Sequence, residues 1–284
     1  MTLVTPGAEP ELLWTGAEWA EGPAWIARTG VLLFSDIPND RIMAYDSTTG
    51  LTTVHRDHVE FANGRTIDLD GNVVQCSHGR RAIEREVDGE VVTIADRWAG
   101  GRFNSPNDVV VASDGAVWFT DPPYGLHSSG REGHPGEQDY EGCFVFRFDG
   151  ETATPVITDM THPNGLAFSP DESLLYVADT GWFWDDTVPL QIRVYDVSSG
   201  EGRLFVTPTG VADGFRVDAA GRLWTSSGAA IEVYSPDAEL LLSIPFPERV
   251  SNLCFGGPDG ADLYVTASAS LYRLSTTTTG ARRP

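Results

Sequence analysis

The sequence has little of what marks a membrane protein or a nucleic-acid-binding protein. Lys and Arg number 19 against 41 Asp and Glu, which gives a formal net charge of −22. This charge argues against binding to nucleic acid, whose phosphates need basic side chains, and against binding to an anionic membrane surface. No apolar run is long enough to span a membrane. The first residues show neither the basic start nor the apolar segment of a signal peptide, so we expect a cytoplasmic protein.

Cysteines and two common catalytic motifs are also scarce or missing. The three cysteines, Cys76, Cys143 and Cys254, are odd in number and far apart, so we expect buried thiols rather than a disulfide. The sequence has no Gly-x-Ser-x-Gly motif, which argues against a serine esterase. It also has no Gly-rich loop between a strand and a helix, so nucleotide chemistry has no support.

What the sequence does contain is one hairpin pattern, repeated six times. The clearest copy is the segment from Arg102 to Gly125, where a polar loop precedes Val109 to Val111, a turn follows, and Val117 to Phe119 complete the hairpin. The turns of the six copies fall about 39 to 57 residues apart, the period expected for propeller blades. They lie at positions 30, 71, 115, 172, 221 and 260.

This repeat predicts an all-β fold, a six-bladed β-propeller formed by residues 1–284 as a single domain. Length alone would suggest about two domains, but one closed ring uses the whole chain. A leftover strand at residues 11–16 is expected to close the ring by completing the last blade, and the tail after Ser275 is expected to fray. The blades are expected at residues 18–58, 61–96, 103–159, 162–207, 211–245 and 249–274.

Two insertions interrupt the repeat. Residues 125–142 form a polar, Gly-rich segment in the third blade, and its place after an inner hairpin would let it lean over one face of the ring. His127 and His134 in this loop are candidates to touch a substrate from above. The second insertion carries Trp182, Phe183 and Trp184, which fit either a sugar-stacking lid or an oligomer contact, so the oligomeric state stays open.

Carboxylates and carboxamides occur at the start of every inner strand. These positions converge on one mouth of the central channel, and their oxygen atoms suit a hard cation such as Ca²⁺ or Mg²⁺. A single Asn or Asp beside Gly or Pro would be explained as a turn residue, but six equivalent positions favour a site. The six are Glu21, Asn63, Asn107, Asn164, Asp213 and Asn252.

Several of these positions lie in longer motifs that resemble one known family, the senescence marker protein/gluconolactonase/luciferin-regenerating family, in its gluconolactonase branch. The resemblance covers essentially the whole chain and keeps the order of the motifs. They are Glu21-Gly-Pro-Ala-Trp, Asn104-Ser-Pro-Asn-Asp, Trp118-Phe-Thr-Asp-Pro-Pro-Tyr-Gly, His162-Pro-Asn-Gly-Leu and Val211-Ala-Asp-Gly.

The resemblance implies a six-bladed propeller with one divalent cation at the channel mouth. It implies Glu21, Asn164 and Asp213 as metal ligands, Asn107 as a fourth ligand or a substrate contact, and Arg102 as a substrate-binding residue. Ca²⁺ is the first candidate for the cation, with Mg²⁺, Mn²⁺ and Zn²⁺ as alternatives. Three further residues are interpreted as substrate contacts: Asn104, Asp121 and His78, the last with a core histidine as an equal alternative.

Together with these residues, the resemblance implies a metal-dependent hydrolase that opens a sugar lactone, its small-molecule partner. A lactone carbonyl polarised by the cation would be attacked by water, with Asp213 as the general base. An organophosphate or other ester hydrolase would use the same site. Activity on aldonolactones compared with activity on phosphofluoridates would distinguish the lactonase from this alternative. A non-catalytic propeller that binds a partner is a third hypothesis, but it predicts large apolar residues at the mouth in place of Glu21, Asn164 and Asp213.

Overall fold

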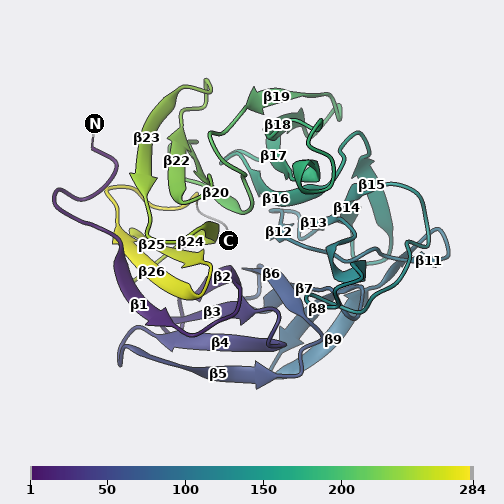
Figure 1. The fold of residues 1–284 in the computed structure, drawn as a ribbon, viewed down its shortest axis with the longest axis horizontal. Helices are drawn as coiled ribbons and strands as arrows, with labels where there is room; N and C mark the ends of the chain where they lie inside the picture. The colour runs from purple at the N-terminus through teal and green to yellow at the C-terminus, as the bar shows by residue number, and fades with distance from the viewer. Residues whose placement is uncertain (1, 282–284) are drawn as a thin grey trace.

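A computed structural model describes residues 2–281, and over this range the chain forms six four-stranded antiparallel sheets around a central axis (Figure 1). The prediction of a six-bladed β-propeller is confirmed. The first five blades follow the chain in order, with the first strand of each innermost: β2–β5 (Ala20–Ile26, Val31–Asp36, Arg41–Asp46, Leu51–Asp57), β6–β9 (Ala62–Ile67, Val73–Ser77, Ala82–Val87, Glu90–Ala95), β12–β15 (Val109–Val111, Val117–Asp121, Phe144–Phe148, Ala153–Ile157), β16–β19 (Pro163–Phe168, Leu174–Asp179, Gln191–Asp196, Gly202–Val206) and β20–β23 (Phe215–Val217, Leu223–Ser226, Ala230–Tyr234, Leu240–Pro245).

The sixth blade joins the two ends of the chain. Strands β24 (Val250–Gly256), β25 (Asp262–Ala267) and β26 (Ser270–Ser275) are completed by β1 (Glu11–Thr15), which pairs antiparallel with β26. In Figure 1 the purple β1 lies along the yellow β26. Arg273 of β26 also forms an ion pair with Glu11 of β1 at 2.6 Å. The closing strand is therefore at the place that the sequence predicted.

Apolar side chains fill the space between neighbouring blades. Leu166 and Phe168 of β16 pack with Val145 of the preceding blade, and all three are buried. The three cysteines are buried free thiols, as expected. For residues 276–281 the expectation of a frayed tail is wrong, because Thr277 N–H donates to Leu3 O and Ala281 N–H donates to Val217 O. The rest of the tail lies outside the described residues. The helices in residues 2–281 are short 3₁₀ turns, none long and apolar enough to cross a membrane.

Glycines bring the starts of the inner strands close to one another. The Gly165 N–H donates to Asp213 O at 3.0 Å, and a Cβ added at Gly165 would lie 2.2 Å from that oxygen. Gly22 and Gly64 approach the next blade in the same way. In three blades the ladder register also shifts at this point, which bends the strand and re-aims its side chains. The glycines thus fix the spacing of the residues that precede them.

Candidate functional site

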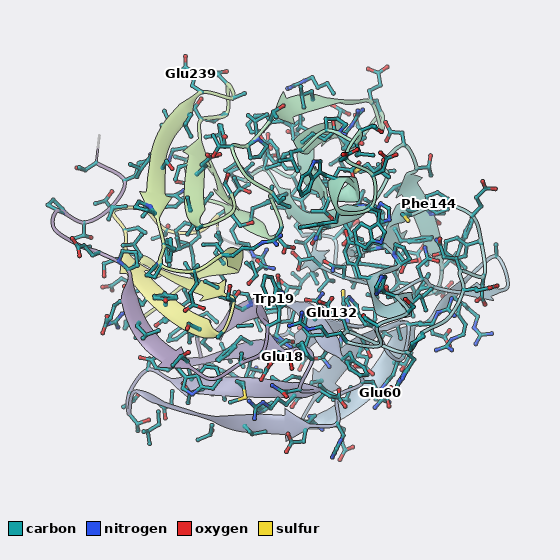
Figure 2. The ribbon with its side chains drawn as sticks, in the orientation of Figure 1. Glu18, Trp19, Glu60, Glu132, Phe144 and Glu239 are labelled. Atoms are coloured by element: carbon teal, nitrogen blue, oxygen red, sulfur yellow. The ribbon has the colours of Figure 1, made fainter. Side chains whose placement is uncertain are left out.

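A cavity of about 450 Å³ opens at the mouth formed by the starts of the inner strands. Five of the six polar positions predicted there line it: Glu21, Asn63, Asn107, Asn164 and Asp213. Figure 2 shows Trp19 and Glu132, two further lining residues, near the centre of the ring. The sixth position, Asn252, is buried and donates to Glu21 Oε2 at 3.1 Å, so it holds a lining residue instead of lining the cavity itself.

The two carboxylates at the mouth are both destabilised in their charged form. Burial raises the pKa of Glu21 well above its usual range, and the charge of Asp213 raises it further. Glu21 Oε2 accepts hydrogen bonds from Gly22 N–H at 2.6 Å and from Asn252, which oppose this rise. Burial raises the pKa of Asp213 to about 7, while the nearby Arg249 guanidinium acts in the opposite direction. Such a carboxylate pair is relieved by a cation or by proton uptake.

The amide side chains complete a set of oxygen donors. Asn164 and Asn107 are buried at the mouth, and the Asn164 amide is within 3.4 Å of Thr180 Oγ1. Among residues 2–281 no cluster of three or more His, Cys, Asp and Glu side chains has the geometry to hold a metal. The donors offered here are instead two carboxylates and carboxamides, the oxygen ligands that a hard cation such as Ca²⁺ takes.

The long loop of the third blade lies over this cavity. His127, Ser129, Arg131 and Glu132 of the loop are among the lining residues, and burial raises the pKa of the Glu132 carboxyl. His78 lies beneath the loop, fully buried, with Nε2 3.1 Å from Asn63 Nδ2 and Nδ1 2.9 Å from Glu132 O. Burial lowers the pKa of His78 to about 4. A neutral His78 therefore connects Asn63 to the loop and does not line the cavity.

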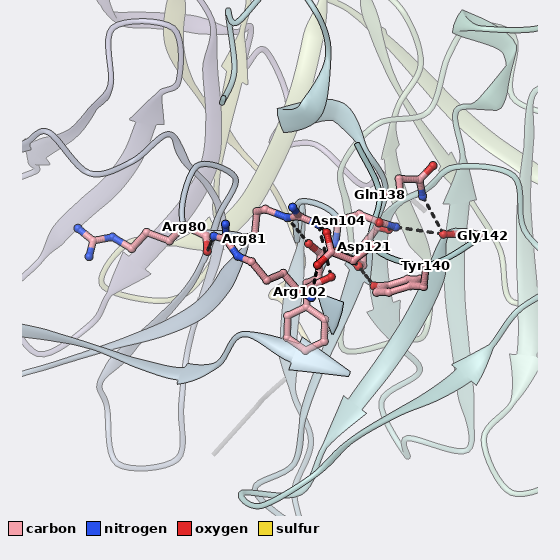
Figure 3. A network of polar contacts seen from close by, with 10 residues as sticks. Arg80, Arg81, Arg102, Asn104, Asp121, Gln138, Tyr140 and Gly142 are labelled. Atoms are coloured by element: carbon pink, nitrogen blue, oxygen red, sulfur yellow. Dashed lines mark hydrogen bonds and ion pairs between the residues drawn. The ribbon is translucent and has the colours of Figure 1, made fainter. Parts of the chain in front are cut away.

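The other three residues interpreted as substrate contacts lie outside the cavity lining, in the polar network that anchors the loop (Figure 3). Asn104 is fully buried; its Nδ2 donates to Asp121 O and to Gly142 O, both at 3.0 Å. The Asp121 carboxylate accepts hydrogen bonds from Asn104 N–H and Tyr140 O–H. Arg102 points away, with Nη2 donating to Arg80 O at 2.7 Å. In this structure Asn104 and Asp121 hold the end of the loop, and the Arg102 backbone N–H donates to Asp139 of the loop at 3.0 Å.

Comparison with known proteins identifies the family. Residues 19–269 match the SMP-30/Gluconolactonase/LRE-like region. The chain belongs to this family. It is 32% identical to a gluconolactonase of Zymomonas mobilis, over 95% of this chain and 82% of that one, and 31% identical to the pentonolactonase XacC of Haloferax volcanii, over 89% and 83%. A solved structure of a gluconolactonase from Xanthomonas campestris is similar, with TM-score 0.89 and 37% identity over 97% of this chain and 94% of that one.

In this member of the SMP-30/gluconolactonase family, aromatic rings form one wall of the cavity. Trp184 stacks on His162 with ring centroids 4.4 Å apart and on Tyr124 at 5.0 Å, and it is joined in the cavity lining by Phe183. Trp182 is exposed and does not line the cavity. The lid interpretation of the insertion therefore fits Phe183 and Trp184.

Sequence reasoning missed three charged residues of the cavity: Arg131, Glu132 and Arg249. Arg131 and Glu132 lie in the long loop, where only His127 and His134 were candidates from the sequence. Arg249 precedes Val250, the first residue of the inner strand β24, so it falls just outside the repeated positions. An arginine immediately before an inner strand, in a chain so rich in acid, was the available signal.

Proposed function

We propose that this protein is a lactonase that adds water to a sugar lactone, with one divalent cation, most suitably Ca²⁺, at the channel mouth. The observation that carries the proposal is the presence of Glu21 and Asp213 in one cavity beside carboxamide oxygens. Burial and the like charge raise the pKa of both acids, a cost that a divalent cation would offset. Relatives more than 30% identical that are named gluconolactonase and pentonolactonase support the substrate class.

Four residues of the chain fit the cation. Glu21, Asn164 and Asp213 would be its ligands, and Asn107 would be a fourth ligand or a contact to a substrate hydroxyl. A bound cation of this kind polarises a carbonyl group and offsets the negative charge that develops on its oxygen. Mg²⁺, Mn²⁺ and Zn²⁺ remain alternatives because they also accept carboxylate oxygens.

The protein's own residues supply the proton transfer and the orientation. Asp213 is the proposed general base, accepting a proton from the attacking water either while it ligates the cation or through a second water, because its carboxylate lies in the cavity beside the other donors. Glu132 is a second carboxylate in the same cavity and the alternative base. The flat face of Trp184 and the ring of Phe183 offer a wall against which the carbon face of a sugar ring can pack.

The test compares three variants on an aldonolactone at rising Ca²⁺ concentration. Asp213→Asn removes the base and one charge, so its kcat should fall at least ~10²-fold and should not recover at saturating Ca²⁺. Glu21→Gln removes charge but no base, so saturating Ca²⁺ should restore most of its activity. Glu132→Gln should stay close to wild type.

Three outcomes would contradict the proposal. Full recovery of Asp213→Asn at high Ca²⁺, together with loss of activity in Glu132→Gln, would transfer the role of base to Glu132. Wild-type activity that survives EDTA treatment would remove the cation from the reaction. Turnover of a phosphofluoridate with none of any aldonolactone would favour the organophosphate hydrolase.

A further inference from the structure

Arg249 differs from the other arginine that lines the cavity. Arg131 forms an ion pair with Glu18 at 3.0 Å, and its side chain is half exposed. Within residues 2–281 the Arg249 guanidinium makes no ion pair and no hydrogen bond, although the chain carries 41 acidic residues against 19 basic ones. A cation inside a cavity that leaves its donors unused is a candidate for binding a negative charge on the substrate.

Two aromatic rings hold this guanidinium in place. Its central carbon lies 4.8 Å from the centroid of the Phe183 ring and 5.6 Å from that of Trp19. The two rings come from different parts of the propeller: Trp19 precedes β2, and Phe183 belongs to the 3₁₀ turn η2 (Gly181–Phe183). A cation over an aromatic ring is attracted by the π-face of the ring, and this contact uses none of the guanidinium N–H groups as hydrogen-bond donors. The group is therefore ordered before a ligand arrives, which lowers the entropic cost of binding.

The backbone brings Arg249 to the side of the cavity where Asp213 lies. Gly214 N–H, next to Asp213, donates to Ser251 O at 2.8 Å, and Ser251 is two residues after Arg249. Gly214 also packs on Asn252, because a Cβ added there would lie 2.0 Å from Asn252 Cγ. In the sixth blade the amide of Asn252 is turned toward Glu21 and does not face the cavity. This blade therefore contributes the Arg249 guanidinium to the mouth in place of an oxygen donor.

We propose that Arg249 binds the negative charge that the reaction creates, first on the carbonyl oxygen and then on the carboxylate of the aldonate product. The inference rests on the proposed lactonase function. Water adds to the carbonyl carbon, the bond from that carbon to the ring oxygen breaks, and the ring oxygen takes a proton to become a hydroxyl group. The resulting acid releases one proton to solvent and leaves a carboxylate. Because the lactone is neutral and these later species are anionic, Arg249 favours the transition state over the substrate.

The test separates recognition of charge from recognition of shape. In Arg249→Gln, kcat/KM on an aldonolactone should fall about 10²-fold, the scale for losing one donor to an oxyanion. The inhibition constant of the aldonate should rise about tenfold or more, as expected for a lost charged hydrogen bond. The inhibition constant of the matching alditol, which has the same hydroxyl groups and no charge, should stay within about twofold. Arg249→Lys keeps the positive charge. The inhibition constant of the aldonate for this variant should therefore lie between the values for Arg249→Gln and for wild type.

Arg147→Gln is the control, because Arg147 lies outside the cavity lining and already has a partner in Asp114 at 2.8 Å. All three constants should stay within about threefold of wild type, since exposed ion pairs contribute little. An unchanged aldonate constant in Arg249→Gln, or equal weakening of aldonate and alditol, would overturn the inference. Thermal unfolding of each variant identifies any loss that comes from misfolding. If the wild type hydrolyses no lactone, the proposed function fails, and calorimetric binding of aldonate against alditol still decides the role of Arg249.

Discussion

Replacing Asp213 with Asn should make the metal-free protein more stable at high pH, although it removes a residue of the proposed site. Burial raises the pKa of Asp213 from 3.8 to about 7, so the folded state holds a proton that the unfolded state releases. The folded state therefore has its full stability below pH 3.8 with respect to this group, and it loses stability as the pH rises through about 7. Asn carries no charge at any pH and avoids this loss.

The size of the effect follows from the shift. About three pKa units correspond to ~4 kcal/mol at 1.36 kcal/mol per unit. Because the carboxylate faces an open cavity, where solvent weakens the interaction, we expect about half of this, ~2 kcal/mol. For a chain of this size that amounts to roughly 4 °C in Tm. The charge of Glu21 acts in the same direction, because the two acids repel each other.

Thermal unfolding in EDTA measures the difference directly. At about pH 8 the Asp213→Asn variant should melt roughly 4 °C above wild type, and at about pH 4 the gap should be small, since wild-type Asp213 is then protonated in the folded state and partly protonated in the unfolded state. Ca²⁺ added at about pH 8 should raise the wild-type Tm more than that of the variant. A gap that is equal at both pH values, or a variant that is less stable at about pH 8, would refute the electrostatic reasoning.

Two further predictions concern the parts that hold the site. Gly165→Ala places a Cβ 2.2 Å from Asp213 O, so urea unfolding should show a loss of about 2 kcal/mol, while Gly136→Ala, whose added Cβ has only ordinary contacts, should change little. Equal losses in the two variants would contradict the close-approach argument. Asp139 accepts hydrogen bonds from Arg102 N–H and from the Arg81 guanidinium, so Asp139→Ala should loosen the long loop. Tryptic cleavage after the exposed Arg131 should then become faster. The KM should rise several-fold, with kcat nearly unchanged. Unchanged cleavage would show that the loop is held elsewhere.

The fold could be predicted because each blade repeats a local signal. Two short apolar runs separated by a turn identify a hairpin from adjacent residues alone, and a nearly constant spacing then gives the number of blades. The mouth residues Glu21, Asn164 and Asp213 follow from the same symmetry, because equivalent positions in a ring must face the same channel. Asn252 shows the limit of this reasoning: it occupies an equivalent position, yet its side chain is turned toward Glu21.

The positions of Arg102, Asn104 and Asp121 could not be predicted in the same way. Their orientation depends on Asp139, Tyr140 and Gly142, which lie at the end of an insertion with no periodicity of its own. A motif identifies such residues but does not say whether they face the substrate or support the loop. His78 was equally ambiguous from the sequence, and its partner Glu132 O belongs to the same insertion.

The symmetry of the ring and the departures from it have different consequences for the chemistry. Equivalent strand starts surround the channel with oxygen donors, which would suit the proposed cation but do not favour one direction of approach for a substrate. The third blade adds the loop that carries Glu132, the fourth adds Phe183 and Trp184, and the sixth adds Arg249. Phe183 and Arg249 are in contact and all of these groups line one mouth, so a lactone in the cavity would meet carboxylates, an aromatic wall and a guanidinium. We therefore expect changes in the insertions to alter substrate specificity, and changes at the repeated strand-start positions to alter affinity for the cation.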